Sequence, residues 1–165
     1  MIRREHGSSG AEFSDCEQYR YSLWRTWSDR GLNGRLCAFI GLNPSTATHE
    51  VDDPTIRRCI GFCKAWGFDG YVMLNLFAFR ATDPRVMKLQ HDPIGEQNDD
   101  AIWSWTAKAG MTVAAWGNHG SYLNRSECVR RPLRDLQLRH LGLTKTGHPK
   151  HPLYLKADTE PVLWN

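Results

Sequence analysis

Residues 36–42 read Leu36-Cys-Ala-Phe-Ile-Gly-Leu42, an apolar run that no charged or amide residue interrupts. A strand with one exposed face alternates apolar and polar residues, whereas a strand covered on both faces stays apolar throughout. The run has the length of a strand, and Asn43-Pro-Ser-Thr-Ala47 follows it as a loop. We therefore predict a strand buried in the middle of a sheet.

The segment after this loop carries the signals of a helix start. Asp53 precedes Pro54, and Asp is favoured as a helix N-cap while Pro suits the first helical position. The predicted helix runs to about Trp66, where glycines follow. Tyr71-Val-Met-Leu-Asn-Leu-Phe77 is the next apolar run, and we predict a second buried strand there.

The rest of the chain repeats this alternation. We predict a helix from Glu96 to Lys108 and a third strand at Met111-Thr-Val-Ala-Ala-Trp116. A further helix is predicted from Ser126 to about His140, with Pro132 kinking or restarting it. A short fourth strand is predicted at Leu143-Thr-Lys-Thr-Gly147.

Strands that alternate with helices form a parallel sheet with helices on both faces. The predicted fold is therefore a three-layer α/β/α domain around a mainly parallel, four-stranded sheet. Tyr19-Arg-Tyr-Ser-Leu-Trp-Arg-Thr-Trp27 alternates in type, and we predict a half-buried N-terminal edge strand, antiparallel to residues 36–42. In such sheets the ligand crevice lies at the carboxyl ends of the strands.

The 165 residues suit one domain, and we expect a flexible leader over residues 1–14 and a single catalytic domain over 15–165. No apolar run is long enough to span a membrane, and the first residues lack the apolar core of a signal peptide. A cytoplasmic location without a membrane partner is therefore expected. The oligomeric state stays open.

Charge gives a weaker indication of partners. The net charge is only +3, but seven Lys and Arg residues against two acidic residues fall between Ser121 and His151. Such a basic segment suits contact with phosphates, or simply forms a solvated face. The five cysteines lack framework spacing, and Cys59 and Cys63 share a helix face without further evident metal ligands. We expect neither a metal nor a cofactor.

Each predicted parallel strand ends in Asn, Gly or His. The ends are Gly41-Leu-Asn-Pro44, Leu74-Asn-Leu-Phe77, Trp116-Gly-Asn-His-Gly120 and Gly147-His-Pro-Lys-His151. These short motifs resemble those of the uracil-DNA glycosylase superfamily, and they match as islands between about residues 36 and 153. The whole chain more closely resembles a family of bacterial and phage proteins to which no activity is assigned.

The glycosylase resemblance implies roles in breaking an N-glycosidic bond. His148 would donate a hydrogen bond to the departing base, with His151 as the competing candidate. Asn43 would position the water, and Asn75 would read the base edge. The efficient uracil enzymes have Asp where this chain has Asn43, which leaves the choice of base open. Asp53 has two interpretations, a nearby catalytic carboxylate or only a helix cap.

The remaining predicted contacts surround this centre. Ser45 joins the substrate-binding set, and Phe77 or Trp116 would stack on the base unless they are core residues. Arg80 and Lys150 are candidates for phosphate contact. Leu153 would enter the vacated base stack, or else pack the C-terminal tail.

Three functions remain open at this stage. The first is a glycosylase that removes a normal or modified base from DNA, with RNA as another polymer substrate. The second is a hydrolase of free nucleosides or nucleotides, and the third is a nucleic-acid-binding module that has lost activity. No nucleophile elbow, phosphate loop or dinucleotide fingerprint occurs. Residues without an assigned role are Arg57, Arg58, Asn98, Asp99 and His119.

Overall fold

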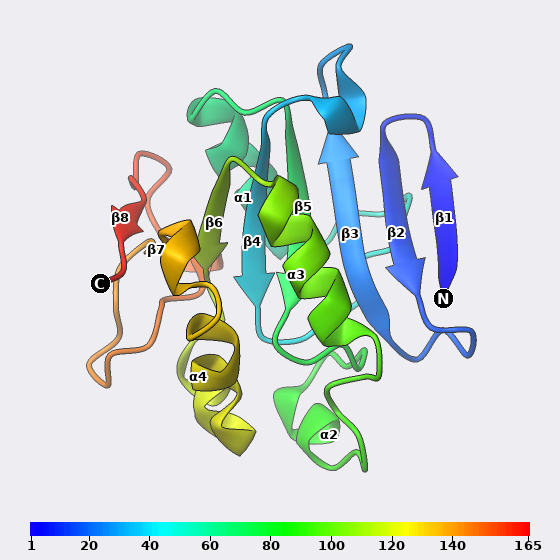
Figure 1. Cartoon of the computed structure of the whole chain (residues 1–165), viewed down its shortest axis with the longest axis vertical. Coiled ribbons are helices and arrows are strands. Elements are labelled where there is room, and N and C mark those ends of the chain that lie inside the picture. The colour runs from blue at the N-terminus through cyan, green and yellow to red at the C-terminus, as the bar shows by residue number, and fades with distance from the viewer.

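A computed structural model describes residues 1–165 as one eight-stranded mixed sheet with four helices (Figure 1). The sheet order is β1-β2-β3-β5-β4-β6-β7-β8. The strands are β1 Ile2–His6, β2 Ser9–Phe13, β3 Arg20–Thr26, β4 Leu36–Gly41, β5 Gly70–Asn75, β6 Met111–Ala114, β7 Arg139–His140 and β8 Val162–Leu163. The helices are α1 Pro54–Ala65, α2 Pro84–Lys88, α3 Asn98–Lys108 and α4 Arg125–Arg130.

Strands β5, β4, β6 and β7 form the parallel centre of the sheet. Every residue of β4 is buried, as its apolar sequence predicts. Cys37 and Phe39 pack in the cluster that contains α1, whereas Ala38 and Ile40 pack in the cluster that contains α3 and α4. Helices therefore cover both faces of the parallel centre, with α1 behind the sheet and α3 and α4 in front (Figure 1).

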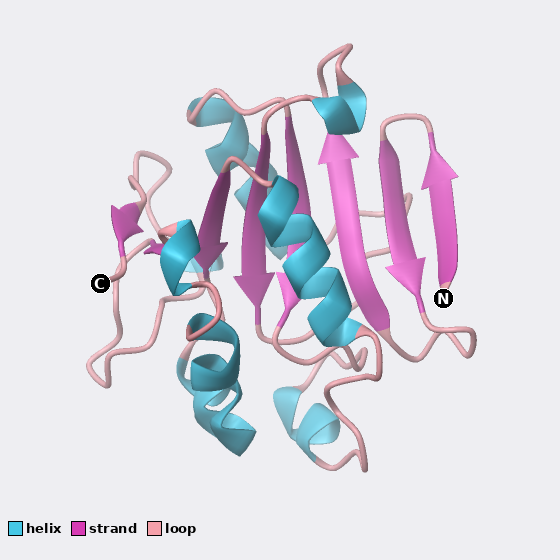
Figure 2. Cartoon of the chain, viewed as in Figure 1, coloured by secondary structure: helices cyan, strands magenta, loops and turns pink.

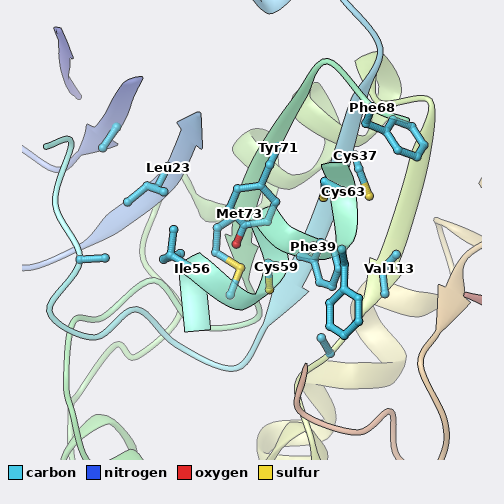
Figure 3. Packing of buried hydrophobic residues seen from close by; sticks show 14 of the residues in the cluster. Leu23, Cys37, Phe39, Ile56, Cys59, Cys63, Phe68, Tyr71, Met73 and Val113 are labelled. Carbon is cyan, nitrogen blue, oxygen red and sulfur yellow. The ribbon is translucent and has the colours of Figure 1, made fainter. Parts of the chain in front are cut away.

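The α1 face has an unusual content of sulfur. Figure 3 shows Cys59 and Cys63 of α1 beside Cys37, Tyr71 and Met73 of the sheet. Burial raises the pKa of the Cys59 and Cys63 thiols well above their usual range. These thiols therefore stay protonated and act as small apolar packing groups.

The sheet is larger than the predicted four strands, and the predicted edge strand lies elsewhere. β3 is not an edge strand and does not pair with β4, because it lies between β2 and β5 and is antiparallel to both. Every residue of β3 is buried. The alternation of residues 19–27 thus indicates a strand but not an exposed face, since neighbours that are remote in sequence cover it.

The expected flexible leader is also wrong, because residues 2–13 form the β1–β2 hairpin. Gly7 supplies the positive φ of its tight turn, which glycine adopts without strain. A Cβ at Gly10 would lie 2.1 Å from the Trp24 ring, so this glycine lets the hairpin approach β3. The two glycines thus reflect a tight turn and a close approach rather than flexibility.

We expect Phe13→Ala to lower the free energy of unfolding by about 3 kcal/mol, because truncating a buried Phe leaves a cavity. Phe13 is buried in the α1-face core together with Ala11. Urea unfolding followed by far-UV circular dichroism measures the change. Tyr154→Ala is the matched control, since Tyr154 is 91% exposed. Equal stability of the wild type and Phe13→Ala would show that the hairpin adds nothing to the core.

The C-terminal third departs from the predicted helix and strand. α4 ends at Arg130, and a turn through Pro132 leads to the two-residue strand β7 at Arg139–His140. Proline has no N–H to continue the helix ladder, which explains the early end. The predicted strand at residues 143–147 is a loop in which Gly147 has φ +81°. None of the helices has the length and apolar character of a membrane span.

Candidate active-site pocket

A pocket of about 350 Å³ lies at the carboxyl ends of β4, β5 and β6, the end of the sheet that carries the long loops (Figure 2). It brings together six of the predicted residues, which come from separate segments of the chain: Asn43, Ser45, Asp53, Asn75, Trp116 and His151. The parallel arrangement of the strands explains the convergence, because their carboxyl ends meet at one edge of the sheet. The predicted location of the site is therefore where the structure has a hollow.

Asn75 is the last residue of β5, and its side-chain amide is the least satisfied group of the pocket. The residue is 1% exposed, yet neither Oδ1 nor Nδ2 has a hydrogen-bond partner. Leaving a buried polar group unsatisfied costs about 1–3 kcal/mol. Gly41 packs closely beside it, because a Cβ there would lie 3.0 Å from Asn75 Oδ1. An amide kept buried and unpaired at this cost points to a bound ligand.

The backbone under Asn75 is held by α3 and α4. Asn98 donates from Nδ2 to the carbonyl oxygens of Asn75 and Leu76, over 3.0 and 3.1 Å. Arg125 donates from Nε to the Leu76 carbonyl over 2.8 Å and forms an ion pair with Asp99. Asn98 and Asp99, which had no role in the sequence, thus position the end of β5.

Asn43 lines the pocket, and the hydrogen bonds of its amide identify which atom is left unpaired. Its Nδ2 donates to the carbonyl oxygens of Ala81 and Pro44, over 2.8 and 3.2 Å. These bonds fix which side of the amide carries the donors. Oδ1 remains as a free acceptor, which suits it to orient a water molecule or a hydroxyl group.

Asp53 is the N-cap of α1, as one of its two predicted interpretations has it. Its Oδ1 accepts a hydrogen bond from the Ile56 N–H over 2.8 Å, so it caps α1. The residue also lines the pocket. A carboxylate has two oxygens, so the cap leaves Oδ2 available to a ligand.

His151 is the histidine of the C-terminal loop that lines the pocket. Its Nδ1 accepts a hydrogen bond from the Leu153 N–H over 3.3 Å, so the proton of the neutral ring is on Nε2. His151 is solvent-exposed as a residue, but partial desolvation of its ring lowers its pKa, and the nearby Asp53 carboxylate opposes this shift. The neutral ring with an Nε2–H donor is therefore the form present at neutral pH.

The loop that carries His151 is fastened to the loop after β6. Gly117 donates its N–H to the Pro149 carbonyl over 2.8 Å. Asn118 Oδ1 accepts from the hydroxyl groups of Thr144 and Thr146, over 2.7 and 2.9 Å. These bonds set the position of the following His151.

The profile of a protein family described as protein of unknown function (DUF1643) matches residues 20–153. The chain belongs to the DUF1643 family. No curated protein and no solved structure matches it. The family match begins at Arg20 and contains every residue that lines the pocket, whereas β1, β2 and β8 lie outside it. The pocket is thus contained in the part of the chain that defines a DUF1643 protein.

Several predicted site residues do not line the pocket of this DUF1643 chain. His148 lies three residues before His151, where its backbone is bonded to Thr144. Phe77 is fully buried in the core and packs against Tyr122, so it is not a stacking surface. The other residues outside the pocket lining are Arg80, Lys150 and Leu153. Arg80 is partly buried and donates to the Glu17 carbonyl, whereas Lys150 is exposed.

Trp116 lines the pocket, but its ring is packed in the core and is not free to stack on a base. It is 2% exposed and packs against Trp164, and its Nε1 has no hydrogen-bond partner. Gly120 closes over its indole, because a Cβ there would lie 2.2 Å from Trp116 Cδ1. The buried ring therefore contributes to the shape of the pocket as a rigid lining residue.

Arg20 also lines the pocket, as does His119, to which no role was assigned from the sequence. His119 Nδ1 lies 2.9 Å from Lys88 Nζ, which is outside the pocket lining. Arg20 was not predicted as a site residue, although an arginine among the aromatic residues of a buried strand is a signal that could have identified it. No group of three or more His, Cys, Asp or Glu side chains is arranged to hold a metal ion.

A larger hollow of about 510 Å³ lies on the α3 side of the sheet and shares no residue with the pocket. Its main buried polar group is Glu12, which accepts hydrogen bonds from Ser22 Oγ and Trp105 Nε1. This group is already satisfied within the protein. The hollow therefore lacks the unpaired buried groups that mark the strand-end pocket.

Proposed function

We propose that this DUF1643 pocket binds a nucleobase and hydrolyses the N-glycosidic bond that joins it to a sugar, as the resemblance to uracil-DNA glycosylases implies. The observation that carries the proposal is the buried, unpaired amide of Asn75 in one pocket with Asn43, Asp53 and His151. One acceptor and two donors on a planar amide match the edge of a base. DNA containing a normal or modified base is the proposed substrate.

Each remaining polar group matches one demand of the reaction. Cleavage leaves negative charge on the base and positive charge on the sugar. The Nε2–H of His151 donates to the oxygen of the departing base, as a neutral donor. Asn43 Oδ1 accepts a hydrogen bond from the attacking water, and the Asp53 carboxylate stabilises the sugar cation. Water adds to the anomeric carbon, and its second proton neutralises the base.

The rim of the pocket supports a polymer substrate over a small one. Exposed apolar side chains stand on the segments that follow β4, β5 and β6 and on the turn after His151: Val51, Leu89, Leu123 and Tyr154. Proteins that take a base out of a duplex use such side chains to fill the gap in the stack. Leu153 is partly buried in the turn after His151, whereas its neighbour Tyr154 is 91% exposed. Tyr154 is therefore the better candidate for the wedge.

The test is incubation with single- and double-stranded oligonucleotides that carry a panel of normal and modified bases, followed by alkali cleavage at abasic sites. Asn43→Ala is expected to abolish release of the base, and Lys108→Ala, which lies in the other hollow, should leave it unchanged. Release from free nucleosides only would favour the small-molecule hydrolase. Binding of oligonucleotides without release of any base would contradict the proposed reaction.

The pH profile tests the role of His151 separately. Because partial desolvation of the ring lowers its pKa, we expect kcat to fall only below about pH 6.5, the ordinary pKa of histidine. The free energy of unfolding should change in the same direction. Because the pKa of His151 is lower in the folded state, its contribution to stability is complete above the unfolded-state pKa and is lost as the pH falls. Measuring kcat between acid and neutral pH locates this acidic fall in activity. A fall that persists in His151→Gln would assign it to another group.

A further inference from the structure

Arg20 is a second buried polar residue of the pocket, and the reaction proposed above gives it no role. It is 1% exposed and lines the pocket. A guanidinium group has five N–H donors. The side chain makes one hydrogen bond, from Nη1 to the Ala47 carbonyl over 2.6 Å, and its Nε has no partner. Most of its hydrogen-bonding capacity is thus unused.

A β-bulge directs Arg20 to this side of the sheet. Phe13 pairs with Arg20 but Glu12 pairs with Ser22, so Tyr21 is an extra residue in β3. Ser22 bonds to Glu12, which bonds to Trp105 on the α3 face. Regular alternation would place Arg20 on that same face. The bulge moves it to the α1 face beside Phe13, and such re-aiming of a side chain is a known use of bulges.

The charge of Arg20 lacks a direct counter-ion in the protein. Arg25 on the same strand pairs with Asp52 at 2.8 Å, whereas Arg20 forms no ion pair. Burial lowers the pKa of Arg20 to about 10, against the opposing effects of Tyr71 and Asp53, so the group stays charged at neutral pH. An unpaired buried charge is costly unless a partner neutralises it. A ligand in the pocket would be that partner.

We propose that Arg20 binds an oxyanion, a carboxylate or a phosphate, carried by the same ligand whose base contacts Asn75. This inference rests on the proposed function, since it takes Asn75 as the base-binding residue. The planar donor fork of arginine matches both oxyanions with two parallel hydrogen bonds. The oxyanion has two sources, an acidic substituent on a modified base or the phosphate of a nucleotide.

Isothermal titration calorimetry of the wild type with four compounds distinguishes these two sources of the oxyanion by their affinities. The compounds are uracil, uracil bearing a ring carboxylate, deoxyuridine and deoxyuridine monophosphate. We expect one anionic compound to bind at least about tenfold more tightly than its neutral counterpart, as a charge-assisted hydrogen bond provides. A gain for the carboxylated base identifies a base substituent, and a gain for the monophosphate identifies the sugar phosphate.

Two arginine variants test whether Arg20 causes this gain in affinity for the anionic compound. Arg20→Gln should abolish it while neutral compounds still bind, and Arg25→Gln should retain it. Arg25 is the matched control, because it lies on the same strand and donates to the Thr48 carbonyl of the same loop but does not line the pocket. The oxyanion site is overturned if the wild type binds no anionic compound more tightly than its neutral counterpart, or if Arg20→Gln keeps this difference in affinity.

The two proposals can fail separately. Binding of uracil and deoxyuridine that is lost in Asn75→Ala would keep the base pocket even when no anionic compound gains affinity. If the neutral compounds do not bind and no oligonucleotide loses a base, the proposed function fails as well.

Discussion

Replacing His151 with alanine is expected to lower kcat for release of the base by about 10²–10³, the usual effect of removing one donor to a developing oxyanion. His148→Ala is expected to change kcat by less than about threefold. His151 lines the pocket and carries its proton on Nε2, whereas His148 does not line the pocket. Single-turnover assays on the best substrate of the oligonucleotide panel measure both variants.

His151→Gln provides the control for structure in this comparison. Glutamine keeps a side-chain acceptor for the Leu153 N–H and so preserves the turn after His151. Equal melting temperatures with unequal kcat would place the effect in the chemistry. The opposite ranking, with His148→Ala as the damaging change, would mean that the His-Pro motif and not the observed pocket marks the catalytic histidine.

Three of the four parallel strands, β4, β5 and β6, could be predicted because their signals are local. The continuous apolar run of β4 and the Asp53 cap of α1 are properties of a few neighbouring residues, and both are confirmed. The antiparallel strands depend on long-range contacts instead. The β1–β2 hairpin is anchored by Ala11 and Phe13 of β2, which reach the core beside α1. The fourth parallel strand, β7, was missed for another reason: its two residues are too few to produce a periodic pattern.

The convergence of the candidate residues could be predicted for those that stand at or just after a strand end. Asn43 and Asn75 follow β4 and end β5, so their convergence was implied by parallel strands. The choice between His148 and His151 depends on the path of an irregular loop that Asn118 fastens from another segment. Arg20 reaches the pocket only through a bulge that pairing with β2 creates. Neither contact has a signature in the nearby sequence.

Asn75→Leu is expected to abolish base binding and, at the same time, to raise the free energy of unfolding by about 1–3 kcal/mol. Leucine has a similar branched shape but no polar atoms. It removes the penalty of burying Oδ1 and Nδ2, neither of which has a partner in the protein. Chemical unfolding measures the stability, and titration with uracil and deoxyuridine together with the oligonucleotide assay measures the loss of function.

Asn98→Leu separates this effect from the removal of any buried amide. Asn98 is equally buried and its Oδ1 also lacks a partner, but its Nδ2, unlike that of Asn75, donates to two backbone carbonyl oxygens, those of Asn75 and Leu76. Its loss leaves those carbonyl groups with fewer donors, so Asn98→Leu should destabilise the protein by about 1–3 kcal/mol. If Asn75 serves a ligand and Asn98 supports the backbone, the two substitutions should change the free energy of unfolding in opposite directions. A loss of stability at both positions would make Asn75 part of the scaffold and remove the main support for a base pocket.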